Sequence, residues 1–210
     1  MLIKFNQLYI EHGIRPTGVF HIGACRGEEI DQYKADGITR VVWIEALPTT
    51  FSDLQANIAN HPEVDSLPIN ACVSDVDGEI VDFNISSNQA ESSSMLEFGT
   101  HAQAHPDVTW VGKTKLKTIK ADTLIAHYGI DVSQYDFLNI DLQGSELKAL
   151  KGMEANMHKF NFAYIEVNRE ELYKGCAMEH EIDEFLAKHG FRPVTELITD
   201  NGWGDKFYAR

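Results

Sequence analysis

The chain has 210 residues, of which 43% are hydrophobic and 24% charged, and this composition is typical of a soluble globular domain with a sizeable core. Its formal net charge of -14 repels phosphate backbones and anionic membrane surfaces, so neither nucleic acid nor membrane is an expected partner. The sparse cysteines, the lack of a membrane-spanning apolar stretch and the lack of a signal-peptide core near Met1 favour a cytoplasmic location.

The first half of the chain alternates strand and helix patterns after an amphipathic lead-in over residues 1–17. In chain order we expect a strand at Val19–Ile22, a helix at Glu28–Asp36, a strand at Val41–Ile44, a helix carrying Phe51, Leu54 and Ile58, and a strand at Leu67–Ser74. The Asp77-Gly78 turn then leads into an alternating run from Ile80 to Ile85, which predicts a strand paired as a hairpin.

Residues 86–112 break this rhythm with serine clusters and scattered glycine and proline. A long irregular insert in a compact domain is usually functional, so we predict a mobile lid that orders when substrate binds.

Regular order then resumes. The expected elements are a short helix at Thr123–Tyr128, a strand at Phe137–Asp141, a helix carrying Leu147, Leu150 and Met157, a strand at Phe162–Val167, a helix carrying Ile182, Phe185 and Leu186, and strands at Val194–Thr199 and Lys206–Arg210. The tight turn over residues 200–204 predicts that the last two strands pair antiparallel. Nothing divides the chain, so residues 1–210 are expected to form a single domain.

Two neighbouring strand ends carry the features of a site for a nucleoside-containing cofactor. Gly23 and Gly27 follow the first strand and let the backbone approach a ligand, and Glu45 ends the second strand, where it can accept hydrogen bonds from ribose hydroxyls. The two glycines lack the G-x-G-x-x-G spacing, which disfavours NAD and favours S-adenosylmethionine. The alternative is that the glycines only cap a helix and that Glu45 only solvates a strand end.

Five motifs together resemble those of FkbM-type methyltransferases, a branch of the class I S-adenosylmethionine-dependent enzymes. They are His21–Gly27, Ile44–Phe51, Ala71–Asp75, Asn139–Glu146 and Ile165–Asn168. The resemblance implies an α/β fold with a Rossmann-like, seven-stranded, mostly parallel sheet, helices on both faces and a C-terminal antiparallel hairpin. It also implies S-adenosylmethionine as cofactor, with S-adenosylhomocysteine as product.

The cofactor-binding residues that the resemblance implies are His21, Gly23, Ala24, Gly27, Glu45, Val73, Ser74 and Asp141. Glu45 would hold the ribose, and the Val73-Ser74 pair would flank the adenine. Such families commonly carry Asp at position 21 and Glu at position 143, where this chain has His21 and Gln143. Imidazole is a poorer partner than carboxylate for the methionine ammonium.

The resemblance further implies methylation of a hydroxyl, on a small molecule or a glycan. The protein must align the hydroxyl with the donor and remove its proton, so the base should lie near the donor. Asp141 and Glu166 end consecutive strands and are the expected bases, and His101 in the insert is a third candidate. Asp141 and Glu166 could instead share a divalent cation, but no metal is expected, and Pro106 directly after His105 disfavours a metal site at His101 and His105.

Two other functions stay open on the sequence. One is an NAD-dependent oxidoreductase or sugar epimerase on a similar fold, although its glycine fingerprint and a tyrosine–lysine catalytic pair are not evident. The other is a methyltransferase-fold protein that binds a ligand without turnover, and His21 and Gln143 keep that alternative open.

Overall fold

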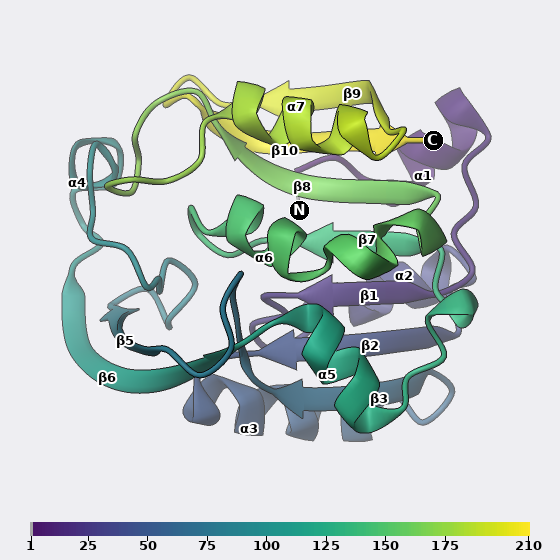
Figure 1. Cartoon of the computed structure of the whole chain (residues 1–210), viewed down its shortest axis with the longest axis horizontal. Coiled ribbons are helices and arrows are strands. Elements are labelled where there is room, and N and C mark those ends of the chain that lie inside the picture. The colour runs from purple at the N-terminus through teal and green to yellow at the C-terminus, as the bar shows by residue number, and fades with distance from the viewer. Residues whose placement is uncertain (1) are drawn as a thin grey trace.

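The computed structural model describes residues 2–210, apart from the side chains of Phe5, Asn6 and Tyr9, and its centre is a seven-stranded sheet (Figure 1). The strands are β1 (Val19–Ile22), β2 (Arg40–Glu45), β3 (Asp65–Asn70), β7 (Phe137–Ile140), β8 (Phe162–Asn168), β9 (Arg192–Ile198) and β10 (Trp203–Ala209). Their order is β3-β2-β1-β7-β8-β10-β9, and all neighbours are parallel except the two pairs that include β10. The expected mostly parallel sheet with a C-terminal antiparallel hairpin is therefore confirmed.

Helices cover both faces of this sheet (Figure 1). One face carries α1 (Phe5–His12), α2 (Ile30–Ala35) and α3 (Pro48–Ala59), and the other carries α5 (Ala121–Tyr128), α6 (Glu146–Gly152) and α7 (Glu179–Lys188). Two 3-10 helices lie at Val132–Gln134 and Glu154–Lys159. No helix among residues 2–210 is both long and apolar enough to cross a membrane.

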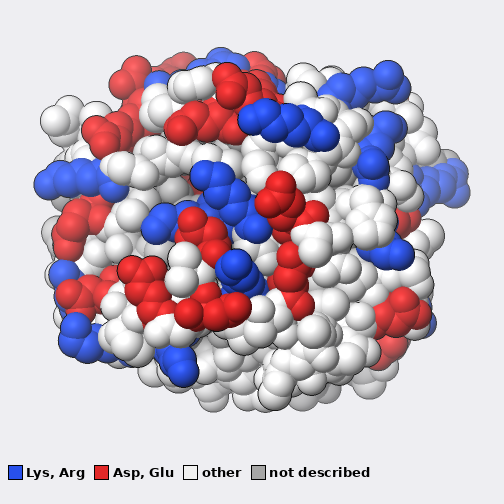
Figure 2. Space-filling model, viewed as in Figure 1, with Lys and Arg blue, Asp and Glu red and all other residues white. Residues whose placement is uncertain are grey.

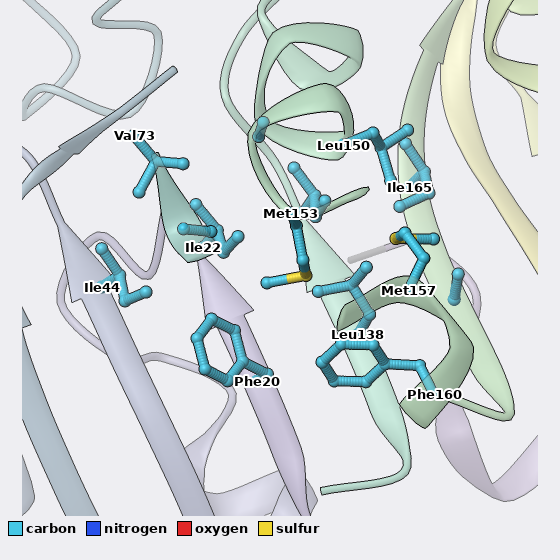
Figure 3. Close-up of a cluster of buried hydrophobic side chains, with 14 of the residues drawn as sticks. Phe20, Ile22, Ile44, Val73, Leu138, Leu150, Met153, Met157, Phe160 and Ile165 are labelled. Atoms are coloured by element: carbon cyan, nitrogen blue, oxygen red, sulfur yellow. The ribbon is translucent and has the colours of Figure 1, made fainter. Parts of the chain in front are cut away.

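The core lies in two layers because successive side chains of a strand point to opposite faces of a sheet. In β1, Phe20 and Ile22 pack against the α5–α7 face, where they meet Leu138 and Met153 (Figure 3). Val19, from the same strand, packs with the residues of the α1–α3 face. Burial on both faces explains why β1 and β7 are almost wholly apolar.

A second, three-stranded sheet corrects two predictions. The strand expected at Leu67–Ser74 is two strands, because the Asn70 side chain donates to the backbone of Glu45 and Ala46 at 2.8 and 3.0 Å and ends β3 there. The chain then enters β4 (Cys72–Val73), which pairs parallel with β6 (Trp110–Ile119). The hairpin expected around Asp77-Gly78 is also wrong, because β5 (Ile80–Ser86) pairs antiparallel with β6 and not with the preceding strand.

The insert expected over residues 86–112 contains the short helix α4 (His101–Ala104) and the beginning of β6. The parallel strands point toward the side of the molecule where α4 and β5 lie (Figure 1). The strand order reverses between β1 and β7, and ligands of open α/β sheets bind at the carboxyl ends of strands at such a switch point. The fold therefore places the insert beside the expected site.

Candidate active site

A cavity of about 440 Å³ opens at the carboxyl ends of the central strands, a size that is typical of small-molecule sites. Most of the predicted site residues line it, namely His21, Gly23, Ala24, Glu45, Val73, His101, Asp141 and Glu166. Gly27 and Ser74 are not among its lining residues. One cavity thus brings together residues that are far apart in the sequence.

Gly23 marks the point where β1 and β7 approach most closely. Its φ is +85°, and a Cβ added there would lie 1.7 Å from the carbonyl oxygen of Asp141. A side chain would therefore push the two strand ends apart. Gly27 has a different task, since a Cβ at that position would lie 2.7 Å from Leu54 Cδ1 on α3. Gly27 permits helix packing and does not contact the cavity.

Glu45 joins two turns at the end of the cavity where the sequence predicts the cofactor. Its Oε2 accepts a hydrogen bond from the backbone N–H of Cys25 at 3.1 Å, and its Oε1 accepts one from Leu47 at 2.8 Å. Burial raises the pKa of this carboxyl to about 7, although the backbone N–H groups oppose the shift. Each oxygen keeps a second lone pair that can accept a hydroxyl.

The predicted adenine pair is divided by the structure. Val73, Cys72 and Phe83 all line the cavity, but Cys72 and Phe83 pack together with Leu47 in one apolar cluster, whereas Val73 belongs to the core beneath α5–α7. Ser74 is buried away from the cavity, where its hydroxyl donates to Asp75 at 3.1 Å. Ser74 lies where the chain passes under α6, since a Cβ added at Gly152 would lie 2.1 Å from the Ser74 carbonyl oxygen.

His21 lines the cavity, but its ring nitrogens are engaged inside the fold. Nδ1 lies 3.2 Å from the Tyr33 hydroxyl, and Nε2 lies 3.3 Å from the amide nitrogen of Asn139. Burial lowers the pKa of His21 to about 3, so the ring is neutral. A neutral ring with both nitrogens engaged is a structural element of the core, and it is poorly suited to hold an ammonium group.

Three carboxyl groups meet at the carboxyl ends of β7 and β8. One ligand-type oxygen from each of Asp141, Glu146 and Glu166 lies within 4.8 Å of the others. The Gln143 side-chain nitrogen bridges two of them, donating to Asp141 Oδ1 and to Glu166 Oε2 at 2.7 Å each. Burial and the nearby charge of Asp141 hold the pKa of Glu166 well above its ordinary value. The geometry therefore favours a proton held within the cluster.

Glu146 shapes the turn between β7 and α6, and sequence reasoning did not identify it. Its Oε1 accepts from the backbone N–H groups of Leu142 and Gly144 at 2.8 and 3.0 Å. Gln143 and Gly144 both have positive φ, at 52° and 100°, so the turn needs this support. Burial raises the pKa of Glu146 to about 7, and its Oε2 has no hydrogen-bond partner among residues 2–210. The sequence signal that could have identified Glu146 is an acidic residue in the first turn of the helix that follows the strand-end acid Asp141.

His101 lies on α4 at the far end of the cavity and is only 3% exposed. Its ring stacks on Phe98 with centroids 4.1 Å apart and an interplanar angle of 2°. Burial and the neighbouring His105 lower the pKa of His101 to about 4, so the ring is neutral and a weak base near pH 7. In the part of the chain that the structure describes, its Nδ1 has no hydrogen-bond partner.

The serine clusters of the insert form a hydrogen-bonded wall beside the carboxyl groups. Ser94 donates its hydroxyl to the carbonyl of Gln143 at 2.8 Å, and Ser93 Oγ accepts from the backbone of Ser86 at 3.0 Å. Arg26, next to the glycine turn, donates to the carbonyl of Gln89 and lies 3.8 Å from Glu91. The insert is therefore attached to both ends of the cavity.

Solved structures with the same fold include several methyltransferases. A proposed tRNA methyltransferase from Streptococcus pneumoniae gives a TM-score of 0.54 at 10% identity, and the match covers 100% of this chain and 70% of that one. Its complex with S-adenosyl-L-methionine gives 0.52 at 11% identity, with 100% and 73% coverage. An uncharacterised protein from Listeria monocytogenes serotype 4b gives 0.54 at 11% identity, with 100% and 68% coverage.

No curated protein matches the sequence. A family match is nevertheless specific: the methyltransferase FkbM domain matches residues 21–193, which include the glycine turn, Glu45 and the carboxyl cluster. The seven-stranded order and the cavity at its switch point agree with that match. The chain therefore belongs to the FkbM methyltransferase family.

Proposed function

We propose that the protein is an S-adenosylmethionine-dependent O-methyltransferase that acts on a hydroxyl of a small molecule or glycan. The observation that carries the O-directed chemistry is the pair of carboxyl groups of Asp141 and Glu166 at the switch point, beside the turn of Gly23. Methylation of a hydroxyl needs an acceptor for its proton, and a carboxyl pair at this position supplies one.

The cofactor end of the cavity fits S-adenosylmethionine. Glu45 offers two oxygens toward ribose hydroxyls, and the apolar surface of Cys72 and Phe83 suits an adenine ring. The similar fold of the Streptococcus pneumoniae complex supports this choice. The bound cofactor would supply an activated methyl group, and the protein would supply alignment and a base.

The base that we assign is Asp141. Glu166 has a raised pKa and retains the proton of the cluster, whereas Asp141 is only partly buried and lines the cavity. Gln143 orients the Asp141 carboxylate through the hydrogen bond to Oδ1. His101 is the weaker candidate because its pKa is lowered to about 4.

We infer that nucleic acid is not the acceptor. None of the described residues that line the cavity is Lys or Arg. Figure 2 shows Lys and Arg side chains interspersed with Asp and Glu on the face that carries α6, without one continuous basic patch. Proteins that bind a phosphate backbone need such a patch. The three free cysteines favour a reducing compartment, and we propose a cytoplasmic location.

The decisive experiment uses donor labelled with carbon-13 in the methyl group, together with small-molecule extract and, separately, total RNA. NMR should find the label in a methyl ether of a small molecule or glycan. Asp141→Asn should cut the transfer rate by about 10²–10⁴ with little change in the affinity for S-adenosylhomocysteine. The exposed Asp31→Asn is the matched control. Label on nitrogen or carbon, or only in RNA, would contradict the proposal.

A further inference from the structure

One segment of the insert forms a side of the cavity. The cavity extends from Glu45 on β2 to Trp203 and Asp205 on β10, with β1, β7 and β8 between these strands. Residues 88–93, with the exception of Gln89, are among its lining residues. We call residues 88–94 the wall segment. Its position therefore determines the shape of the space that a ligand enters.

The two halves of the wall segment are attached differently. The backbone N–H of Ser92 donates to Ser86 Oγ on β5 at 3.1 Å, and the Ser94 hydroxyl donates to the carbonyl of Gln143 at 2.8 Å. In the part of the chain that the structure describes, residues 88–91 have one hydrogen bond to a residue outside 86–93, and its donor is Arg26. The first half of the segment thus depends on Arg26.

The first half of the wall segment has an unfavourable backbone. Gln89 and Ala90 have φ angles of 58° and 72°, a conformation that residues other than glycine rarely adopt. The Arg26 guanidinium donates through Nη2 to the carbonyl of Gln89, and its Nη1 lies 3.8 Å from Glu91 Oε1. These two contacts stabilise a conformation that the segment would otherwise leave.

Arg26 is itself fixed by the turn that Glu45 holds. Its backbone N–H donates to Glu28 Oε2 at 3.1 Å, and its carbonyl accepts from Asn57 Nδ2 on α3 at 2.9 Å. The preceding residue, Cys25, has a φ of 45°, and its backbone N–H donates to Glu45 Oε2 at 3.1 Å. A change in the turn at Cys25 therefore moves Arg26 as well.

The wall segment also contacts the apolar surface at this end of the cavity. Ala90 packs against the cluster of Leu47, Cys72 and Phe83, which we propose as the adenine surface. A ligand seated on Glu45 and on this cluster touches the turn and the wall segment together. Such a ligand favours the position in which the two are joined.

We propose that Arg26 is a positioning residue that couples cofactor binding to closure of the wall segment. The cofactor on Glu45 would fix the turn at Cys25, and Arg26 would then hold residues 88–91 against the cavity. The acceptor would meet a complete cavity only when the cofactor is bound. This inference rests on the proposed function, because it takes S-adenosylmethionine as the cofactor.

The first test measures hydrogen exchange of residues 88–91 by mass spectrometry, without S-adenosylhomocysteine and at concentrations that saturate each protein. In the unchanged protein the ligand should slow exchange by about 10-fold, and in Arg26→Gln it should bind without slowing it. Arg40→Gln removes an exposed arginine 3.3 Å from Asp65, outside the cavity, and should behave like the unchanged protein. Equal slowing in Arg26→Gln overturns the inference and leaves the proposed function intact. Failure of the ligand to bind the unchanged protein contradicts both.

The second test measures the affinity for S-adenosylhomocysteine by titration calorimetry. Because coupling between two events is reciprocal, Arg26→Gln should weaken binding by the same factor, about 10-fold, by which the slowing of exchange is lost. Exchange in β7 should not change, which separates this effect from a general loss of stability. Weaker binding with the slowing retained would mean that Arg26 contacts the cofactor directly, and the inference would fail.

The third test breaks the same contact from the wall segment. Glu91→Gln should weaken binding of S-adenosylhomocysteine in the unchanged protein and have no further effect in Arg26→Gln, where the pair is already lost. Arg26→Lys keeps a charge beside Glu91 and should restore part of the slowing of exchange. Equal effects of Glu91→Gln with and without Arg26 would show that the two residues act independently, and this result would also overturn the inference.

Discussion

The Tyr173 hydroxyl donates to Gln143 Oε1 across 2.5 Å and thereby determines which end of the Gln143 amide faces the carboxyl groups. The amide nitrogen is left to donate to Asp141 and Glu166 at 2.7 Å each. A neutral amide therefore bridges two acids at the carboxyl ends of β7 and β8.

Replacing that amide by a carboxylate should be strongly unfavourable. We expect Gln143→Glu to lower the free energy of unfolding by about 2–4 kcal/mol at pH 8, because it removes the hydrogen bonds to Asp141 and Glu166 and adds a like charge beside Asp141. The loss should shrink at pH 5, where the cluster takes up protons. Urea denaturation at both pH values measures it. Gln55→Glu adds the same charge on the exposed side of α3 and is the control. Equal stability of the two variants at pH 8 would show that Gln143 has no bridging role.

Glu45 should determine the affinity for the cofactor. Glu45→Ala removes an acceptor for ribose hydroxyls and the link between Cys25 and Leu47, so binding of S-adenosylhomocysteine should weaken by about 1–3 kcal/mol. Isothermal titration calorimetry gives the value, and Glu79→Ala is a control outside the cavity. Tighter binding of NAD than of S-adenosylhomocysteine to the unchanged protein would contradict the choice of cofactor.

Glu146 should make stability fall as the pH rises. Burial raises the pKa of Glu146 from 4.5 to about 7. The protonated carboxyl group therefore contributes fully to the free energy of unfolding below pH 4.5, and this contribution is lost as the pH rises through 7. Glu146→Gln keeps an oxygen for Leu142 and Gly144 but cannot ionise. Its stability relative to the unchanged protein should therefore increase by about 1–3 kcal/mol between pH 5 and pH 8. Chemical denaturation at the two pH values tests this, with the exposed Glu184→Gln as control. If the difference in the free energy of unfolding between Glu146→Gln and the unchanged protein is the same at pH 5 and pH 8, the raised pKa of Glu146 is refuted.

Hydrogen exchange should divide the insert into two parts. Residues 92–96 are hydrogen-bonded to Ser86, Asn84 and Gln143, so their amides should be protected without ligand. Residues 88–91 contain Gln89 and Ala90 at φ 58° and 72°, an unfavourable backbone for such residues, and should exchange fast until ligand binds. Mass spectrometry with and without S-adenosylhomocysteine resolves the two segments. Protection of 88–91 equal to that of β7 in the absence of ligand would contradict a mobile lid.

The strand ends that carry the site could be predicted from the sequence because their signals are local. An apolar run followed by Gly23, by Glu45 or by Asp141 indicates a strand and the residue that ends it, and parallel strands bring such ends together. The parallel pairing of β1 with β2 and of β7 with β8, and the antiparallel C-terminal hairpin, agree with those predictions.

The sequence did not reveal which distant strands pair, or which side chains form hydrogen bonds to residues far away in the chain. β5 pairs with β6 across the whole insert, and the residues between them carry no signal that selects that partner over the nearer β4. The end of β3 depends on the side chain of Asn70 turning back to Glu45, which composition does not reveal. The bridging role of Gln143 likewise depends on its positive φ and on Tyr173, thirty positions away. The neutral state of the His21 ring also depends on Tyr33 and Asn139, which come from other elements.

The position of Trp203 and Asp205 on β10 has a consequence for the order in which the site is completed during synthesis. Residues 21–73 supply the end of the cavity that we propose binds the cofactor, and Asp141 follows with β7, so these parts leave the ribosome early. The opposite wall cannot form until β10 inserts between β8 and β9. Because domains fold from the N-terminal side as they are made, a nascent chain would acquire its cofactor surface well before its acceptor surface. Translation therefore completes the proposed acceptor side of the cavity last.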